Sequence, residues 1–245
     1  MEKTGKIISV SIISIAIVVS AMCLGNAYRN RGKATKKIEV TGKAERDFTA
    51  DLIVWNASFT KQSMDMKDAF KQLKSDESTV KNYLTEKGIK EDEMVFSSVQ
   101  IEKVYDGFYD EKGRYNRKFL GYELRQEVSI SSKDINRVEK ISREVSDLID
   151  AGVVLTSDSP DFFYTKLSDL KLELVEEATA DGRIRAEKIA YSAKADIGRL
   201  IYANLGIFQI TGQHSNENYS WGGAFNTKSK EKTASITVRL NFETK

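Results

Sequence analysis

The amino-acid sequence predicts an α+β fold: antiparallel sheets with packed helices in two similar lobes, preceded by an N-terminal transmembrane or signal helix. Segments that alternate apolar and polar residues, as half-buried strands do, come in pairs. These pairs surround three separated segments that have the apolar spacing of amphipathic helices, a succession typical of helices packed on an antiparallel sheet. An uncharged apolar run close to the N-terminus predicts the leading helix.

The strand-like segments lie throughout the chain after residue 35. In chain order they are residues 36–45, 51–61, 94–105, 122–131, 153–155, 162–165, 200–211 and 233–242. The polar residues 106–118 are expected to form a hairpin connection, and the Gly-, Asn- and Ser-rich residues 212–229 a loop before the last strand. Pro160, the only proline, lies between the two shortest segments.

Three later segments have the helical period. The first covers about residues 63–87, and Gly88 follows it as the residue expected after a C-cap. The second presents apolar side chains from Ile135 to Ile149 on one face and ends before Gly152. The longest covers about residues 167–193. Its apolar residues are Leu167, Leu170, Leu174, Val175, Ala178 and Ile189.

The apolar run covers residues 7–24, and it contains no charged residue. Eighteen residues at about 1.5 Å each form a helix of roughly 27 Å, close to the hydrocarbon thickness of a bilayer. We therefore expect a membrane anchor, with a cleaved signal peptide ending near Ala27 as the alternative and a buried core helix as a third interpretation. The predicted division is a membrane anchor or signal segment with a basic linker, residues 1–37, and one domain, residues 38–245.

The charges divide at the same boundary. Residues 1–37 hold seven basic side chains and one acidic one, for a net charge of +6, whereas residues 38–245 hold 31 basic and 35 acidic ones, for a net charge of −4. The acidic domain has no basic stripe, which argues against a nucleic-acid partner. Five basic residues follow the apolar run and two lysines precede it, so the positive-inside rule alone would keep the domain in the cytoplasm.

The sequence contains no recognisable catalytic constellation. His214, the only histidine, lies in a polar loop, and Cys23, the only cysteine, lies within the apolar run. Cys23 is expected to be a membrane-buried small side chain, with lipid modification as the alternative. No glycine-rich phosphate-binding loop occurs. We therefore predict a protein that is not an enzyme, with no catalytic, cofactor-binding or metal-binding residues, no cofactor and no identified small-molecule ligand.

Three carboxylate groups are expected to be solvated rather than catalytic. They are Glu91-Asp92-Glu93, Glu176-Glu177, and Asp106 with Asp110 and Glu111, for which weak calcium binding is the alternative. Two segments, 104–115 and 218–225, are rich in aromatic residues. They are expected either to be exposed loops that bind a partner or to fold back onto the domain's own edge.

Several motifs together resemble the SIMPL-domain family, which includes bacterial periplasmic immunogenic proteins and an oxidative-stress defence protein. The similar segments are Ile38–Gly42, Ala50–Leu52, Glu86–Ile89, Gly121-Tyr122, Leu170–Glu177, Ala180–Ala190, Ile197–Leu200 and Ala234–Val238. The resemblance covers roughly residues 38–245. Ala50 replaces a proline that the family often has there, Gly182 replaces the usual alanine, and the leader looks more like an anchor than a cleavable signal. The resemblance implies an extracytoplasmic α+β protein without established catalytic residues, some of whose relatives form ring- or channel-like oligomers.

The sequence therefore predicts a non-enzymatic, membrane-anchored extracytoplasmic protein that forms homo-oligomers, linked to envelope or oxidative stress. Release into the periplasm or medium after cleavage near Ala27 is the alternative localisation. The alternative function is a ligand-binding or stress-sensing module that uses a cleft between the two lobes, lined by Tyr105, Tyr109 and Trp221. A hydrolase that uses only carboxylates is the third hypothesis.

Overall fold

The computed structural model describes residues 2–31 and 37–244, with side chains for residues 13–29 and 37–244. Helix α1, Glu2–Arg31, contains the predicted leading helix, and its described side chains are exposed. Among the described residues, no helix is long and apolar enough to cross a membrane. The side chains of residues 7–12, the first third of the predicted membrane segment, and the linker residues 32–36 lie outside this description.

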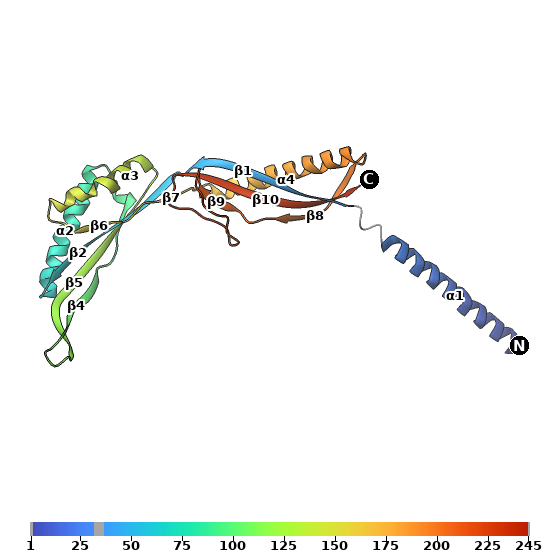
Figure 1. Cartoon of the computed structure of the whole chain (residues 1–245), viewed down its shortest axis with the longest axis horizontal. Coiled ribbons are helices and arrows are strands. Elements are labelled where there is room, and N and C mark those ends of the chain that lie inside the picture. The colour runs from blue at the N-terminus through green and yellow to red at the C-terminus, as the bar shows by residue number, and fades with distance from the viewer. Residues whose placement is uncertain (1, 32–36, 245) are drawn as a thin grey trace. The chain divides into compact units, whose positions relative to one another are not determined.

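The rest of the chain has the predicted α+β composition with antiparallel sheets (Figure 1). It divides into two compact units: residues 45–171 with 208–235, and residues 1–44 with 172–207 and 236–245. The units are not two similar lobes, because one contains two helices on a six-stranded sheet and the other packs one long helix on three strands.

The unit of residues 45–171 and 208–235 is built on a central pair of long strands, β2 (Leu52–Ser63) and β5 (Tyr115–Ser132). Around this pair lie β3 (Met94–Phe96), β4 (Gln100–Tyr109), β6 (Leu155–Ser157) and β7 (Asp161–Phe163). Helices α2 (Met66–Glu86) and α3 (Ile135–Glu144) pack on one face of it (Figure 1). That face supplies the core, which includes Trp55 and Phe59 from β2 and Leu124 and Val128 from β5, all at most 1% exposed.

The helix ends follow the sequence signals. The carboxylate of Asp65 accepts hydrogen bonds from the backbone N–H groups of Lys67 and Asp68 and so caps α2. Gly88 follows with a φ of +90°, the left-handed conformation that glycine adopts without steric cost. After α3, a 3₁₀ turn at Val145–Ile149 completes the predicted second helix, and Gly152 has a φ of +79°.

Two predicted strands are interrupted. Residues 94–105 form β3 and then β4, because Ser97 leaves the ladder and exchanges hydrogen bonds with the backbone of Glu127. Residues 200–211 form β8 (Ile197–Leu205) and β9 (Gln209–Gly212), with Gly206 bonded through its N–H to the carbonyl of Thr237.

The predicted connection at residues 106–118 was wrong in its extent. The hairpin strands continue through it, and only residues 110–114 form the turn. The polar composition concealed these strands because both faces of the hairpin are exposed, so no apolar alternation marks them.

In the other unit, α4 (Leu167–Ser192) packs on β1 (Lys37–Thr49) and β10 (Glu231–Thr244). The residues that α4 buries recur at every fourth position. They are Leu170, Leu174, Ala178, Ala186 and Ala190, with Gly182 also in this row. Ile189, predicted on this face, is 49% exposed.

Glycines allow this helix to approach the sheet closely. A Cβ added to Gly42 of β1 would lie 2.0 Å from the carbonyl oxygen of Ala178, and one added to Gly182 would lie 2.6 Å from Leu240 Cδ1. An alanine in place of Gly182 would therefore displace the side chain of Leu240.

Candidate functional site

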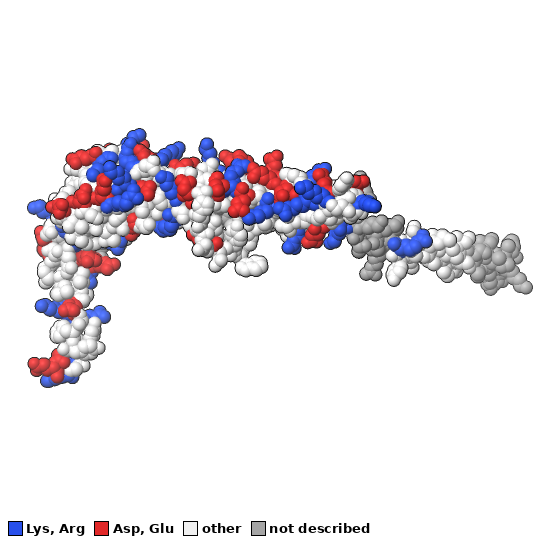
Figure 2. Space-filling model, turned by 45° about the horizontal axis from the view of Figure 1, so that its top comes forward, with Lys and Arg blue, Asp and Glu red and all other residues white. Residues whose placement is uncertain are grey.

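The sequence-predicted polar candidates lie apart from one another. His214 is exposed, with a φ of +57°, and Glu176 and Glu177 lie on the exposed face of α4. Among the described residues, no three His, Cys, Asp or Glu side chains are grouped so that they could hold a metal ion. On the face seen in Figure 2, basic and acidic side chains intermingle over the sheets and helices.

Two of the carboxylates predicted to be solvated also accept hydrogen bonds from neighbouring turns. Asp110 accepts hydrogen bonds from the backbone N–H groups of Lys112 and Arg114, each at 2.9 Å, and from the Arg114 guanidinium at 3.0 Å. The backbone N–H of Arg114 contributes most to keeping the pKa of Asp110 below its usual value. Glu93 accepts hydrogen bonds from the Ser132 hydroxyl and the Lys90 backbone, and the first of these is the main cause of its lowered pKa.

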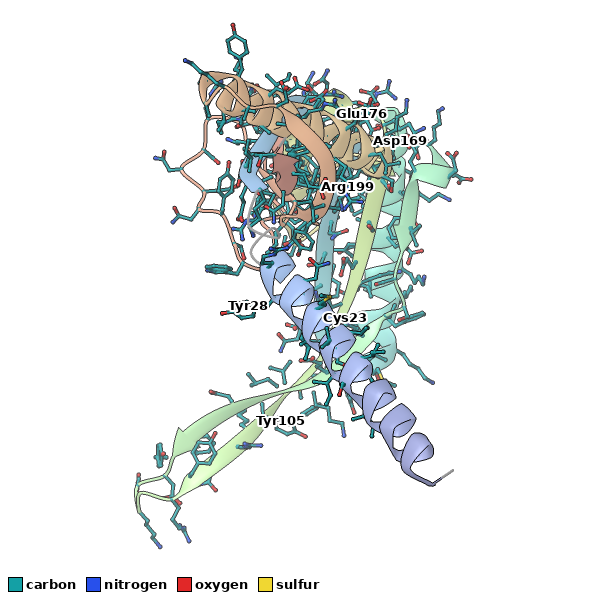
Figure 3. All side chains as sticks on the ribbon, turned by 90° about the vertical axis from the view of Figure 1, so that its right-hand side faces the viewer. Cys23, Tyr28, Tyr105, Asp169, Glu176 and Arg199 are labelled. Atoms are coloured by element: carbon teal, nitrogen blue, oxygen red, sulfur yellow. The ribbon has the colours of Figure 1, made fainter. Side chains whose placement is uncertain are left out.

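The aromatic residues expected in a cleft between lobes belong to one unit. Tyr105 and Tyr109 lie on β4 and are 49% and 73% exposed, and Figure 3 shows Tyr105 on the β4–β5 hairpin. Trp221 lies in the loop between β9 and β10 and is 96% exposed. These three side chains therefore do not come from two facing lobes.

A buried lysine, which sequence analysis did not single out, lies beside an aromatic pocket. Lys232 at the start of β10 is 2% exposed and donates hydrogen bonds to the backbone and side-chain oxygens of Asn226. Burial lowers its pKa, because desolvation disfavours the charged form. The pocket is lined by Phe48, Phe162, Phe163, Tyr164, Leu167, Ile210, Phe225, Asn226 and Lys232. Its volume of about 10 Å³ corresponds to one water molecule, so it is not a preformed ligand site.

The edge strand β8 of the β1–β10–β8 sheet carries exposed apolar side chains. Among the described residues, this sheet ends at β8 on one side and β1 on the other. Leu200, Ile201, Tyr202 and Leu205 of β8 are 46%, 52%, 51% and 57% exposed. No charged residue occurs from residue 200 to residue 210, whereas β1 carries charged side chains at Lys37, Glu39, Lys43, Glu45, Arg46 and Asp47. Arg199, labelled in Figure 3, immediately precedes the uncharged stretch and is paired with Glu243 at 2.9 Å.

Strand β8 is exposed because α4 is too narrow to cover all three strands of the sheet. A helix is about 10 Å across and strands lie about 4.8 Å apart, so one helix covers about two strands. Val238 of β10 is 1% exposed, yet Leu205, its partner in β8, is more than half exposed. Directly paired residues point to the same face, so β8 presents to solvent the face that β10 buries. The uncharged sequence LIYANL, residues 200–205, could have indicated an unprotected edge strand.

Comparison with known proteins identifies a family for most of the chain. The SIMPL family model, described as a protein of unknown function (DUF541), matches residues 38–242. No curated protein matches the chain. The resemblance predicted from the motifs is therefore confirmed over nearly its full expected range.

Proposed function

Because the chain belongs to the SIMPL family, whose function is unknown, we propose a function from the chain's own surfaces. The protein is a non-enzymatic, membrane-anchored component of the cell envelope whose extracytoplasmic domain self-assembles through β8. Residues 7–24 are the anchor, and cleavage near Ala27 is the alternative. The resemblance to an oxidative-stress defence protein adds an expected role in envelope or oxidative stress.

The exposed edge of β8 is the observation that carries the self-assembly. An uncovered strand presents unpaired backbone N–H and C=O groups, and natural proteins protect such edges with charges, bulges or a covering element. Strand β1, the opposite edge, has alternating charges, but β8 has none from residue 200 onward. A strand from a second copy would pair with this backbone and cover side chains that α4 does not reach.

The anchor rests on a separate property of the sequence. Residues 7–24 are uncharged and long enough, at roughly 27 Å, to cross the hydrocarbon core of a bilayer. The five basic residues that follow would lie beside lipid head groups. An extracytoplasmic domain follows from the family resemblance rather than from these charges.

Sedimentation of the full chain in detergent tests the self-assembly. We expect wild type to form a discrete oligomer and Tyr202→Lys to dissociate at least about tenfold more readily, because a charge at an exposed edge position opposes pairing. Both proteins retain residues 7–24, so any association of the anchor cancels in the comparison.

Thr41→Lys, at an exposed position of β1, is the matched control. If β8 pairs with β8 of a second copy, Thr41→Lys assembles as wild type does. If β8 pairs with β1, both variants dissociate. A wild-type chain that stays monomeric at every concentration, or an unaffected Tyr202→Lys, would contradict the proposal.

A ligand-binding or stress-sensing module is the second candidate function. The buried Lys232 with its lowered pKa favours it, since perturbed titratable groups cluster at functional sites. The small pocket would have to open for a ligand to enter. A thermal-shift screen with envelope metabolites, peptidoglycan fragments and divalent cations tests this function, and an absence of stabilisation by all of them would exclude it for these compounds.

A further inference from the structure

The loop between β9 and β10 can be followed in Figure 1. It carries a tryptophan on a hydrogen-bonded turn. The Gly223 N–H bonds to the Ser220 carbonyl at 3.0 Å, which closes a four-residue turn, and Gly223 has a φ of +93°. Trp221 lies inside this turn and is 96% exposed. Tyr219 and Phe225 on either side are 60% and 58% exposed.

A buried glutamine holds the turn from below. Gln209 of β9 is 8% exposed, and its side-chain oxygen accepts hydrogen bonds from the N–H groups of Ser220 at 3.3 Å and Ala224 at 2.6 Å. Its side-chain nitrogen donates to the Ser220 carbonyl at 2.9 Å. One side chain therefore bonds to three backbone groups of the turn, which orders the backbone that carries Trp221 before any partner binds.

Part of the backbone of this turn is hydrogen-bonded within the protein. In addition to the groups bonded to Gln209, the Gly222 N–H bonds to the Ser220 hydroxyl, and the Ala224 carbonyl and Asn226 N–H both pair with Ile210. A polar backbone group without a partner is costly to bury in lipid, so these bonds lower the cost of placing the turn at the water-facing edge of a bilayer.

The charges of the loop lie away from its tip. Residues 218–227 contain no charged side chain. Glu217 is turned to the base of the loop, where it accepts hydrogen bonds from the Gly212 N–H and the Asn226 side chain. Tryptophan and tyrosine favour the membrane interface, where the ring is buried and the polar atom meets water.

We propose that the turn Ser220–Gly223 is a membrane-docking loop that inserts Trp221 into the interfacial region of a lipid bilayer. The proposal goes beyond self-assembly and does not depend on it. A protein partner is the less favoured occupant, because the uncharged residues 218–227 offer such a partner no charged group to pair with beside the aromatic rings.

The fluorescence of Trp221 in vesicles tests the proposal. The chain has two tryptophans, and Trp55 is 1% exposed, so Trp221→Phe supplies the signal of Trp55 alone. The full chain is added to phosphatidylcholine/phosphatidylglycerol vesicles with plain or brominated acyl chains. We expect bromine to quench the Trp221 signal at least about twofold and to leave Trp55 unchanged.

A tryptophan at another exposed tip is the matched control. In the Trp221→Phe background, Tyr109→Trp places an indole at the charged end of the β4–β5 hairpin, where we expect no bromine quenching. Equal quenching at both positions would overturn the assignment to the Ser220–Gly223 turn.

Two further outcomes would overturn the insertion itself. One is a chain that floats with the vesicles while its Trp221 remains unquenched; in that case membrane attachment by residues 7–24 stands and the docking loop fails. The other is a Trp221 that is shielded from acrylamide but insensitive to brominated lipid, which would assign the turn to a protein surface.

Discussion

Two turns in the unit of residues 45–171 and 208–235 carry aromatic side chains. The turns differ in what these aromatic rings contact. The turn at residues 110–114 joins β4 to β5, and the turn Ser220–Gly223 lies between β9 and β10. Each is organised by one polar side chain that bonds to its backbone, Asp110 in the first and Gln209 in the second.

The aromatic rings of the hairpin pack on one another. Tyr109 and Tyr115 lie opposite each other with ring centroids 5.4 Å apart, and Tyr105 and Phe119 are 5.5 Å apart. The tip between them carries Asp110, Glu111, Lys112 and Arg114. Trp221, by contrast, is almost fully exposed on an uncharged tip. Aromatic composition alone therefore does not distinguish rings that pack on one another across a hairpin from a ring that is exposed to solvent.

Removing the glutamine that holds the Ser220–Gly223 turn has the largest expected effect. Gln209→Ala leaves two N–H groups and one carbonyl of the turn without their buried partner, and we expect a loss of about 2–3 kcal/mol in the free energy of unfolding. Urea unfolding measures the loss, and hydrogen exchange should become faster at the amides of Ser220 and Ala224.

Gln213→Ala is the control for this variant. Gln213 is partly exposed and makes one side-chain hydrogen bond, to Asp47 at 3.0 Å, so we expect a loss below about 1 kcal/mol. If both glutamine variants lost the same stability, the turn would not depend on Gln209.

Breaking the aromatic packing of the hairpin has a smaller effect. Tyr115→Ala removes the ring that faces Tyr109 and lies over Gly107, where an added Cβ would be 2.2 Å from the Tyr115 hydroxyl oxygen. We expect a loss of about 1 kcal/mol, since cross-strand aromatic pairs contribute about that much. Tyr191→Ala on α4, where the side chain is 86% exposed, should change the unfolding free energy little. If Tyr115→Ala were as stable as wild type, the hairpin aromatics, like the exposed Trp221, would not stabilise the fold.

Much of the fold could be predicted from the sequence because its signals are local. The carboxylate of Asp65, the left-handed Gly88 and the alternation of β2 each act within a few residues, and the predicted elements there agree with the structure. The hairpin strands were missed because a ribbon exposed on both faces has no apolar alternation. The difference between the two units was also missed, because it depends on which strands pair across long stretches of sequence.

The sites were harder to predict than the fold. Tyr105, Tyr109 and Trp221 were predicted to line a cleft between two lobes, but they are exposed and belong to one unit, which composition could not show. Gln209 and Lys232 carried no signal, because burial and three-dimensional proximity, not residue type, give them their partners. The β8 edge could have been recognised from its uncharged run, but only its place at the end of a sheet makes that run unusual.

Lowering the pH should weaken the turn at residues 110–114 but not the turn Ser220–Gly223. This is the smallest of the expected effects. The pKa of Asp110 lies below its usual value of 3.8 in the folded chain, chiefly because the Arg114 N–H bonds to its carboxylate. The stability that this carboxylate contributes is therefore fully present above pH 3.8 and is lost as the pH falls through the lower, folded-state pKa. The amide resonances of Lys112 and Arg114 should titrate in that range, and Asp110→Asn should abolish the titration. The Ser220–Gly223 turn is held by a neutral glutamine, so its Ala224 amide should not follow the same curve. If the Ala224 amide followed the same titration as the amides of Lys112 and Arg114, acid would be unfolding the whole unit. The pH dependence of the turn at residues 110–114 would then not be due to the charge of Asp110.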